Sequence, residues 1–124
     1  MKFMRSDLLT AVMGNRSRDW HTVILPFTLA HSAILIILGF GGAGLEDSGV
    51  QLALAAMSVL GSLWIVIAFD GAIADLAAGM KDMDEEMASS HIGRNFAKAP
   101  FAAFRILNVA IVALIVIAEL MAIY

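Results

Sequence analysis

The amino-acid sequence predicts an all-α integral membrane protein with three transmembrane helices. Of its 124 residues 60% are apolar and 15% are charged, whereas soluble domains average about 45–50% and about 25%. A chain this short has too small an interior to bury so much apolar surface. Three of its apolar stretches reach the length of about 20 residues that a helix needs to cross a bilayer. We therefore expect residues 1–124 to form a single three-helix transmembrane domain.

Residues 1–21 are polar and basic and are expected to lie at the cytoplasmic surface of the membrane. Residues 6–13 can form a short interfacial helix that Ser6 caps and Gly14 ends. The apolar face of this helix would carry Met4, Leu8 and Val12. A basic tail without regular structure is the alternative for the same residues.

The first span is expected at 22–42 and contains Pro26 near its start, where a helix tolerates a missing N–H. Glycines at 39–44 end it and begin a short external turn. The second helix is expected at 50–88, and its length of about 57 Å is nearly twice the bilayer core. Its last third would therefore extend into the cytoplasm. A cytoplasmic linker at 89–100 then leads to the third span at 101–124.

The basic residues predict which way the chain crosses the membrane. Lys and Arg accumulate on the cytoplasmic side of transmembrane helices, and none lies in the turn at 43–49 or near the C-terminus. We therefore expect an inner-membrane protein with its N-terminus and long second loop in the cytoplasm and its C-terminus outside. The eight basic residues are Lys2, Arg5, Arg16, Arg18, Lys81, Arg94, Lys98 and Arg105.

The cytoplasmic part of the second helix carries an apolar stripe. Its members recur at spacings of three and four residues, which is the period of one helix face, and we expect the stripe to dock on a partner. A copper(I) site that uses its thioethers together with His91 is the alternative. The stripe consists of Ile73, Leu76, Met80, Met83 and Met87.

Polar side chains within the spans are costly in lipid, so each is a candidate functional residue. Helical rise places His31 about 12 Å and Asn108 about 10 Å from the cytoplasmic ends of their spans. We expect His31 to bond to Asn108, Ser32 or a carbonyl of a neighbouring helix. The alternative is that His31 ligates a haem or another metal, or carries protons.

Three further polar side chains lie nearer the ends of the predicted spans: Asp70, Arg105 and Glu119. Asp70 and Arg105 lie near the inner ends of their spans and are expected to pair, which would offset the desolvation cost of both. Glu119 has no Lys or Arg on its side of the membrane. It is expected either to stay charged close to water or to be protonated or paired with another chain.

The sequence lacks the motifs of a self-contained enzyme. It contains no phosphate-binding glycine loop, no His-Glu-x-x-His and no nucleophile elbow. In outline the three spans are similar to the membrane-anchor subunits of succinate dehydrogenase. That resemblance implies a haem-ligating His in the second span, where this chain has none, so no haem or quinone residue carries over.

The most favoured function is a non-catalytic small subunit that stabilises or positions other subunits of a membrane complex of respiratory, photosynthetic or oxygenase type. Its partners would be lipids and other integral membrane subunits, not nucleic acid, and the residues call for no cofactor. The second hypothesis is a homo-oligomeric transporter or channel. The third is a haem or quinone anchor that uses His31.

Overall fold

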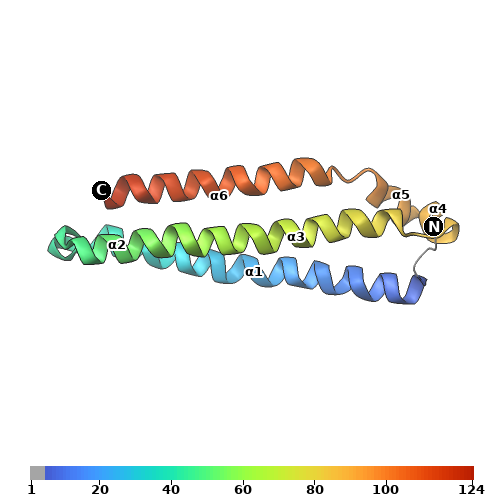
Figure 1. Cartoon of the computed structure of the whole chain (residues 1–124), viewed down its shortest axis with the longest axis horizontal. Helices are drawn as coiled ribbons and strands as arrows, with labels where there is room; N and C mark the ends of the chain where they lie inside the picture. The colour runs from blue at the N-terminus through green and yellow to red at the C-terminus, as the bar shows by residue number, and fades with distance from the viewer. Residues whose placement is uncertain (1–4) are drawn as a thin grey trace.

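The computed structural model describes residues 5–124, and all of its regular elements are helical. Three long helical rods lie side by side (Figure 1). The first is α1 (Ser6–Phe40), the second runs through α2 (Ser48–Ala56), a π-helical turn η2 (Met57–Gly61) and α3 (Ser62–Lys81), and the third is α6 (Phe101–Ile123). Each rod is long and apolar enough to cross a membrane, which confirms the predicted fold class.

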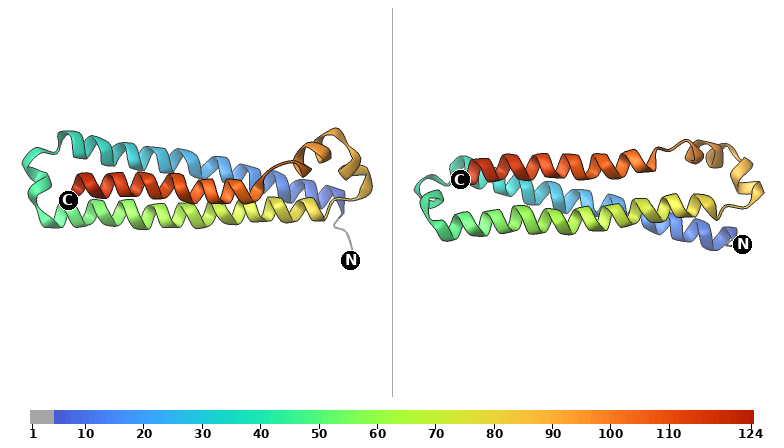
Figure 2. Two further views of the ribbon diagram at one scale, coloured as in Figure 1. Left: turned by 90° about the horizontal axis from the view of Figure 1, so that it is seen from above. Right: turned by 45° about the horizontal axis from the view of Figure 1, so that its top comes forward.

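The second rod is the centre of the packing. It contacts α1 and α6 along its length, whereas α1 and α6 touch each other less and enclose a groove between them. The rod that lies between the other two differs between the two views of Figure 2, so the three rods do not lie in one plane. The side chains that line this groove therefore come mainly from α1 and α6, and Ile65 and Phe69 of α3 form its floor.

The first helix is longer than expected. The predicted stop at Gly14 is wrong, because α1 runs without a break from Ser6 into the first span. Leu9 and Met13 pack against Gly79 of α3, and this contact outweighs the cost of about 1 kcal/mol for a glycine inside a helix. Arg16 of the same stretch also pairs with Asp75 of α3 at 2.7 Å.

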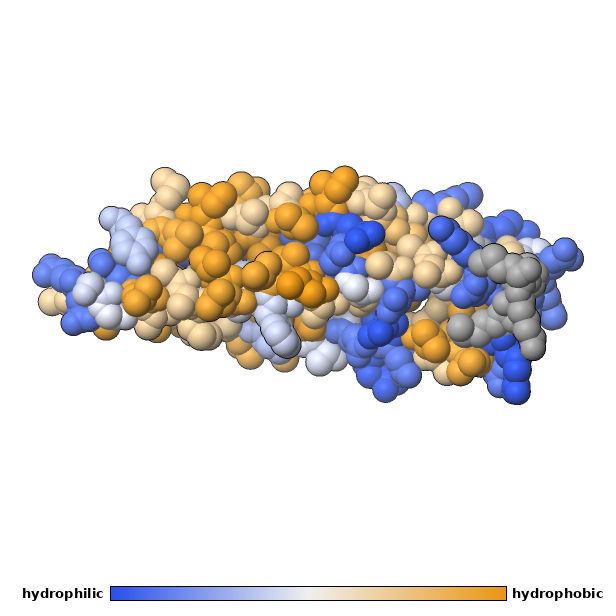
Figure 3. Space-filling view, in the orientation of Figure 1, coloured by the Kyte–Doolittle hydropathy of each residue, from blue (hydrophilic) through white to orange (hydrophobic). Residues whose placement is uncertain are grey.

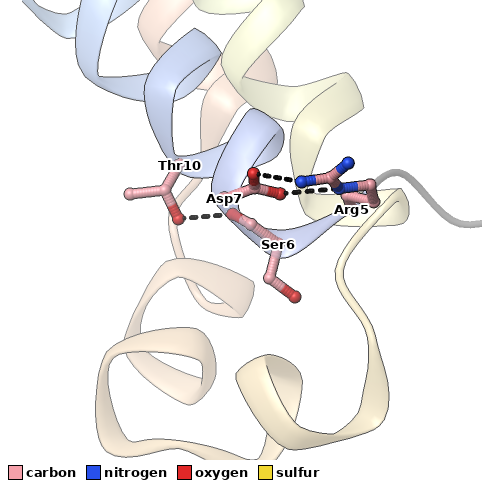
Figure 4. Close-up of polar contacts among 4 residues, drawn as sticks. All are labelled: Arg5, Ser6, Asp7 and Thr10. Carbon is pink, nitrogen blue, oxygen red and sulfur yellow. Dashed lines mark hydrogen bonds and ion pairs between the residues drawn. The ribbon is translucent and has the colours of Figure 1, made fainter.

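The start of α1 is held by local polar contacts. The guanidinium of Arg5 donates to both carboxylate oxygens of Asp7 at 3.1 and 2.7 Å, and the Thr10 hydroxyl donates to the Ser6 carbonyl at 2.8 Å (Figure 4). Asp7 also lies in the first turn, where a negative charge favours the helix dipole. Lys2 and Met4, which the sequence places at this surface, lie outside the described residues.

The second rod ends earlier than predicted, at Lys81 and not at residue 88. Asp84 accepts a hydrogen bond from the Met87 N–H and so begins a new short helix, α4 (Glu85–Ser89). The Ser6 hydroxyl donates to the same carboxylate, and this bond, together with the Met87 N–H, holds the pKa of Asp84 below its ordinary value. The helix cap at Asp84 therefore begins a new helix, although the apolar spacing of the second rod continues to Met87.

The segment after α4 is more regular than its sequence indicated. Residues expected as a linker contain α5 (His91–Ala97), which begins where Ser90 accepts a bond from the Gly93 N–H.

At the opposite end of the bundle a 3₁₀ turn, η1 (Gly42–Glu46), joins the first two rods. Gly42 adopts φ of 52° there, which a glycine does without strain. Asp47 then caps α2, which begins at Ser48, two residues before the predicted start at residue 50.

The two ends of the bundle differ in their content of Lys and Arg, although both ends carry Asp and Glu. We call the end with α4, α5 and the start of α1 the basic end, and the end with η1 and the C-terminus the acidic end. A broad apolar surface separates hydrophilic ends in Figure 3, as a membrane-spanning body requires. All basic residues among the described ones lie in the half nearer the basic end: Arg5, Arg16, Arg18, Lys81, Arg94, Lys98 and Arg105.

Candidate functional site

Four polar side chains from all three rods meet inside the bundle. They are His31 of α1, Ser58 of the π turn, Ser62 at the start of α3 and Glu119 of α6, and we call them the His31–Glu119 cluster. His31 is 8% exposed and the other three are at most 2% exposed. Ionisable groups that are buried at membrane depth are candidate functional residues.

The hydrogen bonds of the cluster form a continuous chain. Nδ1 of His31 lies 2.6 Å from Oε1 of Glu119, and the Ser58 hydroxyl donates to Oε2 of Glu119 at 2.6 Å. Nε2 of His31 lies 3.0 Å from the Ser62 hydroxyl. Both ring nitrogens and both carboxylate oxygens thus have a partner within the chain. The cluster connects each rod to the other two.

Local backbone geometry brings the two serines to the same place. Ser58 and Ser62 are four residues apart, so they project from nearby faces of one rod. The helix between them is π-helical over Met57–Gly61, and single π turns are common at functional sites. Gly61 within this turn has open space where a Cβ would stand. The turn is therefore not imposed by a close approach at Gly61.

The cluster lies toward the acidic end of the bundle. Four residues separate Glu119 from Ile123 at the end of α6, which corresponds to about 6 Å of helix, and nine residues or about 13 Å separate His31 from Phe40. The described basic residues all lie in the other half of the bundle. No Lys or Arg among residues 5–124 forms an ion pair with Glu119; the ionisable side chain in contact with it there is His31.

The predicted contact between His31 and Asn108 is wrong. The amide of Asn108 reaches the Val66 carbonyl at 3.5 Å, while His31 bonds to Glu119 and Ser62. The expected depths of His31 and Asn108 were counted from the starts of their apolar stretches. The ring centroids of Trp20 and Phe104 are 6.4 Å apart, which shows that α6 begins beside an earlier part of α1. Asn108 is therefore closer to the basic end than His31 is.

Glu119 is buried, so the expectation that it lies close to water is wrong. Its hydrogen-bond partners, His31 and Ser58, belong to this chain and not to another one. The alternative that Glu119 is protonated stays a prediction. The hydrogen bonds of Ser58 to Glu119 and of Ser62 to His31 were not predicted from the sequence. Their spacing of four residues within an apolar stretch, together with His31 and Glu119 in the neighbouring spans, was the available signal.

Asp70 and Arg105 are in contact, as expected. Nε and Nη2 of Arg105 donate to the two carboxylate oxygens of Asp70 at 2.6 and 2.8 Å, a two-point geometry that is strong for its type. Both side chains are partly exposed. They line a shallow surface with Ile106 and Val109, whereas Asn108 faces the groove on the other side of α6.

The apolar stripe at the basic end is largely covered by the chain itself. Ile73 is 0% exposed, and Leu76 and Met83 are also buried, so the expectation of an exposed docking stripe is wrong for these three. The physical reason is the continuation of α1, which packs Leu9 and Met13 over this face. Met80 and Met87 remain half-buried.

Metal ligation finds little support in the described residues. They include no group of three or more His, Cys, Asp or Glu side chains placed to hold a metal ion. A haem ligand role for His31 would require Ser62 to release Nε2. His91, the proposed partner of the thioethers, lies with Nδ1 3.1 Å from the Arg94 guanidinium.

An apolar groove between α1 and α6 reaches the His31–Glu119 cluster. One part has a volume of about 480 Å³ and runs from Trp20 and Phe104 to Asn108 and Val112. A second part of about 370 Å³ continues past Phe27, which both parts share, to His31 and Glu119. The cluster thus forms part of the wall of this groove.

Comparisons with protein-family models, curated proteins and solved structures found no match. The function proposed below therefore rests on the geometry of the chain itself.

Proposed function

We propose that the protein is a non-catalytic subunit of a larger membrane complex and that the groove between α1 and α6 accepts a transmembrane helix of a partner subunit. The observation that carries this proposal is the groove. Its walls are two helices that the second rod keeps apart, so the bundle has three of the four positions of a four-helix bundle. The partner's helix would take the fourth position.

The length of the groove suits a helix. Along α1 its lining extends from Trp20 to Leu35, a distance of about 22 Å at 1.5 Å per residue. That is about four helical turns and most of the thickness of a bilayer core. Its lining is mainly aromatic and aliphatic, and Ile24, Leu107 and Ile111 on its walls are exposed in the isolated chain.

Asn108 favours a protein occupant over lipid. Its side chain lines the groove and has one long contact, at 3.5 Å, which leaves most of its hydrogen-bonding capacity unused. Acyl chains offer no hydrogen-bond partner, whereas a polar side chain or carbonyl on a neighbouring helix does. A partner helix that bonds to Asn108 would satisfy a group that lipid would leave unpaired.

A homo-oligomeric channel has less support. Its path was expected to use His31, Asn108, Asp70 and Glu119 together. The pair of Asp70 and Arg105 lies on a different side of α6 from Asn108, and His31 and Glu119 bond to each other. These polar groups therefore do not line one continuous face.

Site-specific photo-crosslinking in the native membrane tests the proposal. A benzophenone amino acid replaces Ile24 or Leu107 on the groove walls, and a matched variant replaces Ile106, which is exposed on the other side of α6. We expect both groove positions to capture one defined polypeptide, identified by mass spectrometry, and position 106 to capture much less of it.

Three results would contradict the proposal. Adducts with lipid alone at the groove positions would show that lipid fills the groove. Adducts with a second copy of this chain alone would favour the homo-oligomer. Equal capture of many polypeptides at all three positions would show that the groove has no defined partner.

A further inference from the structure

We propose that His31 and Glu119 together form a binding site for one exchangeable proton within the membrane, which leaves the cluster with no net charge. This inference stands independently of the proposed function. It rests on the hydrogen-bond geometry of four buried side chains and on the charges around them.

The hydrogen bonds accommodate the proton in two positions. With the proton on the imidazole, Nδ1–H donates to Oε1 of Glu119 and Nε2–H donates to the Ser62 oxygen. With the proton on the carboxyl, Oε1–H donates to Nδ1, and Nε2–H keeps the same bond to Ser62. Only one proton moves, across a contact of 2.6 Å, and the Ser58 hydroxyl donates to Oε2 in both states.

Release of that proton would leave a neutral imidazole and an ionised carboxylate. Nδ1–H would then donate to Oε1, and the Ser62 hydroxyl would rotate to donate to Nε2. All hydrogen bonds survive, but the cluster carries one negative charge. The geometry therefore tolerates both protonation levels, and the choice between them depends on the electrostatic environment.

That environment favours the neutral cluster. The side chains around the cluster from α1 and α6 are apolar or uncharged: Phe27, Thr28, Ser32, Leu35, Ile115 and Ala118. The second rod contributes the hydroxyls of Ser58 and Ser62. Among the described residues, no basic side chain other than His31 pairs with Glu119. An uncompensated charge in an apolar environment is strongly unfavourable, and one bound proton removes it.

The position of the cluster indicates how the proton exchanges. Glu119 lies about one helical turn from the end of α6 at the acidic end, and the cluster forms part of the wall of the groove between α1 and α6. His31 lies about 13 Å from the end of α1 at the acidic end and about 38 Å from its start at the basic end, so the shorter path to water leads to the acidic end. We infer that the proton exchanges with the aqueous phase on that side.

Spectroscopy of the full chain in lipid nanodiscs tests the proton count. His21 and His91, both exposed and in the half of the bundle nearer the basic end, are replaced by Gln so that ¹⁵N magnetic resonance reports His31 alone. Infrared absorption reports a protonated carboxyl, assigned by its shift in Glu119→Asp and its loss in Glu119→Gln. Glu46→Gln, at an exposed residue in the turn η1, is the matched control that should leave that absorption unchanged.

At neutral pH we expect either an imidazolium signal from His31 or a protonated-carboxyl band from Glu119, and their summed occupancy should be one proton. Transfer to D₂O should shift the carrier's signal as the proton exchanges. In Glu119→Gln, whose side chain is neutral without a proton, His31 should be neutral. A neutral His31 beside an ionised Glu119, in the protein whose cluster residues are native, would overturn the proposal. An imidazolium signal that persists in Glu119→Gln would also overturn it. So would a His31 or Glu119 proton signal that never exchanges in D₂O.

Discussion

At the scale of single residues, the His31–Glu119 cluster shows how a membrane bundle can specify one arrangement of its helices. Helices in lipid gain no hydrophobic energy by associating, so packing and polar contacts between them decide their register. In the described part of the chain, every buried side-chain nitrogen and oxygen has a hydrogen-bond partner. A rotation or shift of any one rod would break the bonds of His31 or Glu119 and leave polar groups in lipid.

Replacing Glu119 by Ala should therefore destabilise the bundle. The change leaves Nδ1 of His31 and the Ser58 hydroxyl without partners, and unsatisfied buried groups cost about 1–3 kcal/mol. We expect a decrease of that size in the free energy of unfolding, measured by denaturation in mixed micelles. Glu119→Gln keeps one carbonyl oxygen and an amide donor, so its effect should be smaller.

Leu114→Ala provides the control, because Leu114 is 67% exposed on the same helix and faces lipid. That variant should change the unfolding free energy by less than about 0.5 kcal/mol. Equal effects of the two alanine variants would show that the cluster adds nothing to stability beyond its apolar contacts.

The two polar pairs show what residue patterns can and cannot predict. Asp70 and Arg105 have opposite charge and lie at equivalent depths in adjacent antiparallel spans, so their contact follows from counting residues. The contact of His31 with Glu119 depends on the true length of α1 and on where α6 begins beside it, and neither is encoded in the apolar periods. The clue was chemical: two ionisable groups in lipid without other partners.

At the scale of helices, packing between rods outweighs a local stop signal in α1, whereas a local cap outweighs the apolar period after α3. Gly14 was a plausible end for a helix, but the helix continues because Leu9 and Met13 gain a contact surface on α3 at Gly79. In the other direction, the cap at Asp84 ends a helical pattern whose apolar period continues. Apolar periodicity locates the three spans well but does not distinguish a continuous helix from one that is capped and restarted.

A pair of glycine substitutions should separate these effects. A Cβ at Gly14 would meet nothing within 4 Å, whereas a Cβ at Gly79 would lie 3.2 Å from the Met13 side chain and 3.5 Å from that of Leu9. Gly14→Ala should therefore raise the unfolding free energy by about 0.5–1 kcal/mol through its better helix propensity. Gly79→Val should lower it by about 1–3 kcal/mol through overpacking.

Amide hydrogen exchange in nanodiscs would locate the damage. In Gly79→Val we expect loss of protection in the first four turns of α1 and unchanged protection around the His31–Glu119 cluster. Stabilisation by both substitutions would mean that the first turns of α1 do not pack on α3, and the account of why α1 continues past Gly14 would be wrong.

At the scale of the whole molecule, charge and shape together predict an orientation in the membrane. All basic residues among the described ones lie in the half nearer the basic end, and Glu46 and Asp47 mark the acidic end. The odd number of spans puts the start of α1 and the end of α6 at opposite ends of the bundle (Figure 1). If the basic end faces the cytoplasm, then the acidic end and the cluster beside it face the exterior.

Cysteine labelling can test that orientation directly, because the natural chain contains no cysteine and a single introduced thiol is therefore unique. Ser48 at the start of α2 and Ser89 at the end of α4 are exposed and lie at opposite ends of the bundle. With a membrane-impermeant maleimide on intact cells, Ser48→Cys should react at once, whereas Ser89→Cys should react only after the membrane is opened. The reverse pattern would place the basic end outside, and the proton of the His31–Glu119 cluster would then exchange with the cytoplasm. Reaction of both variants in intact cells would contradict a single orientation, and the charge asymmetry between the ends would then not control how this chain inserts.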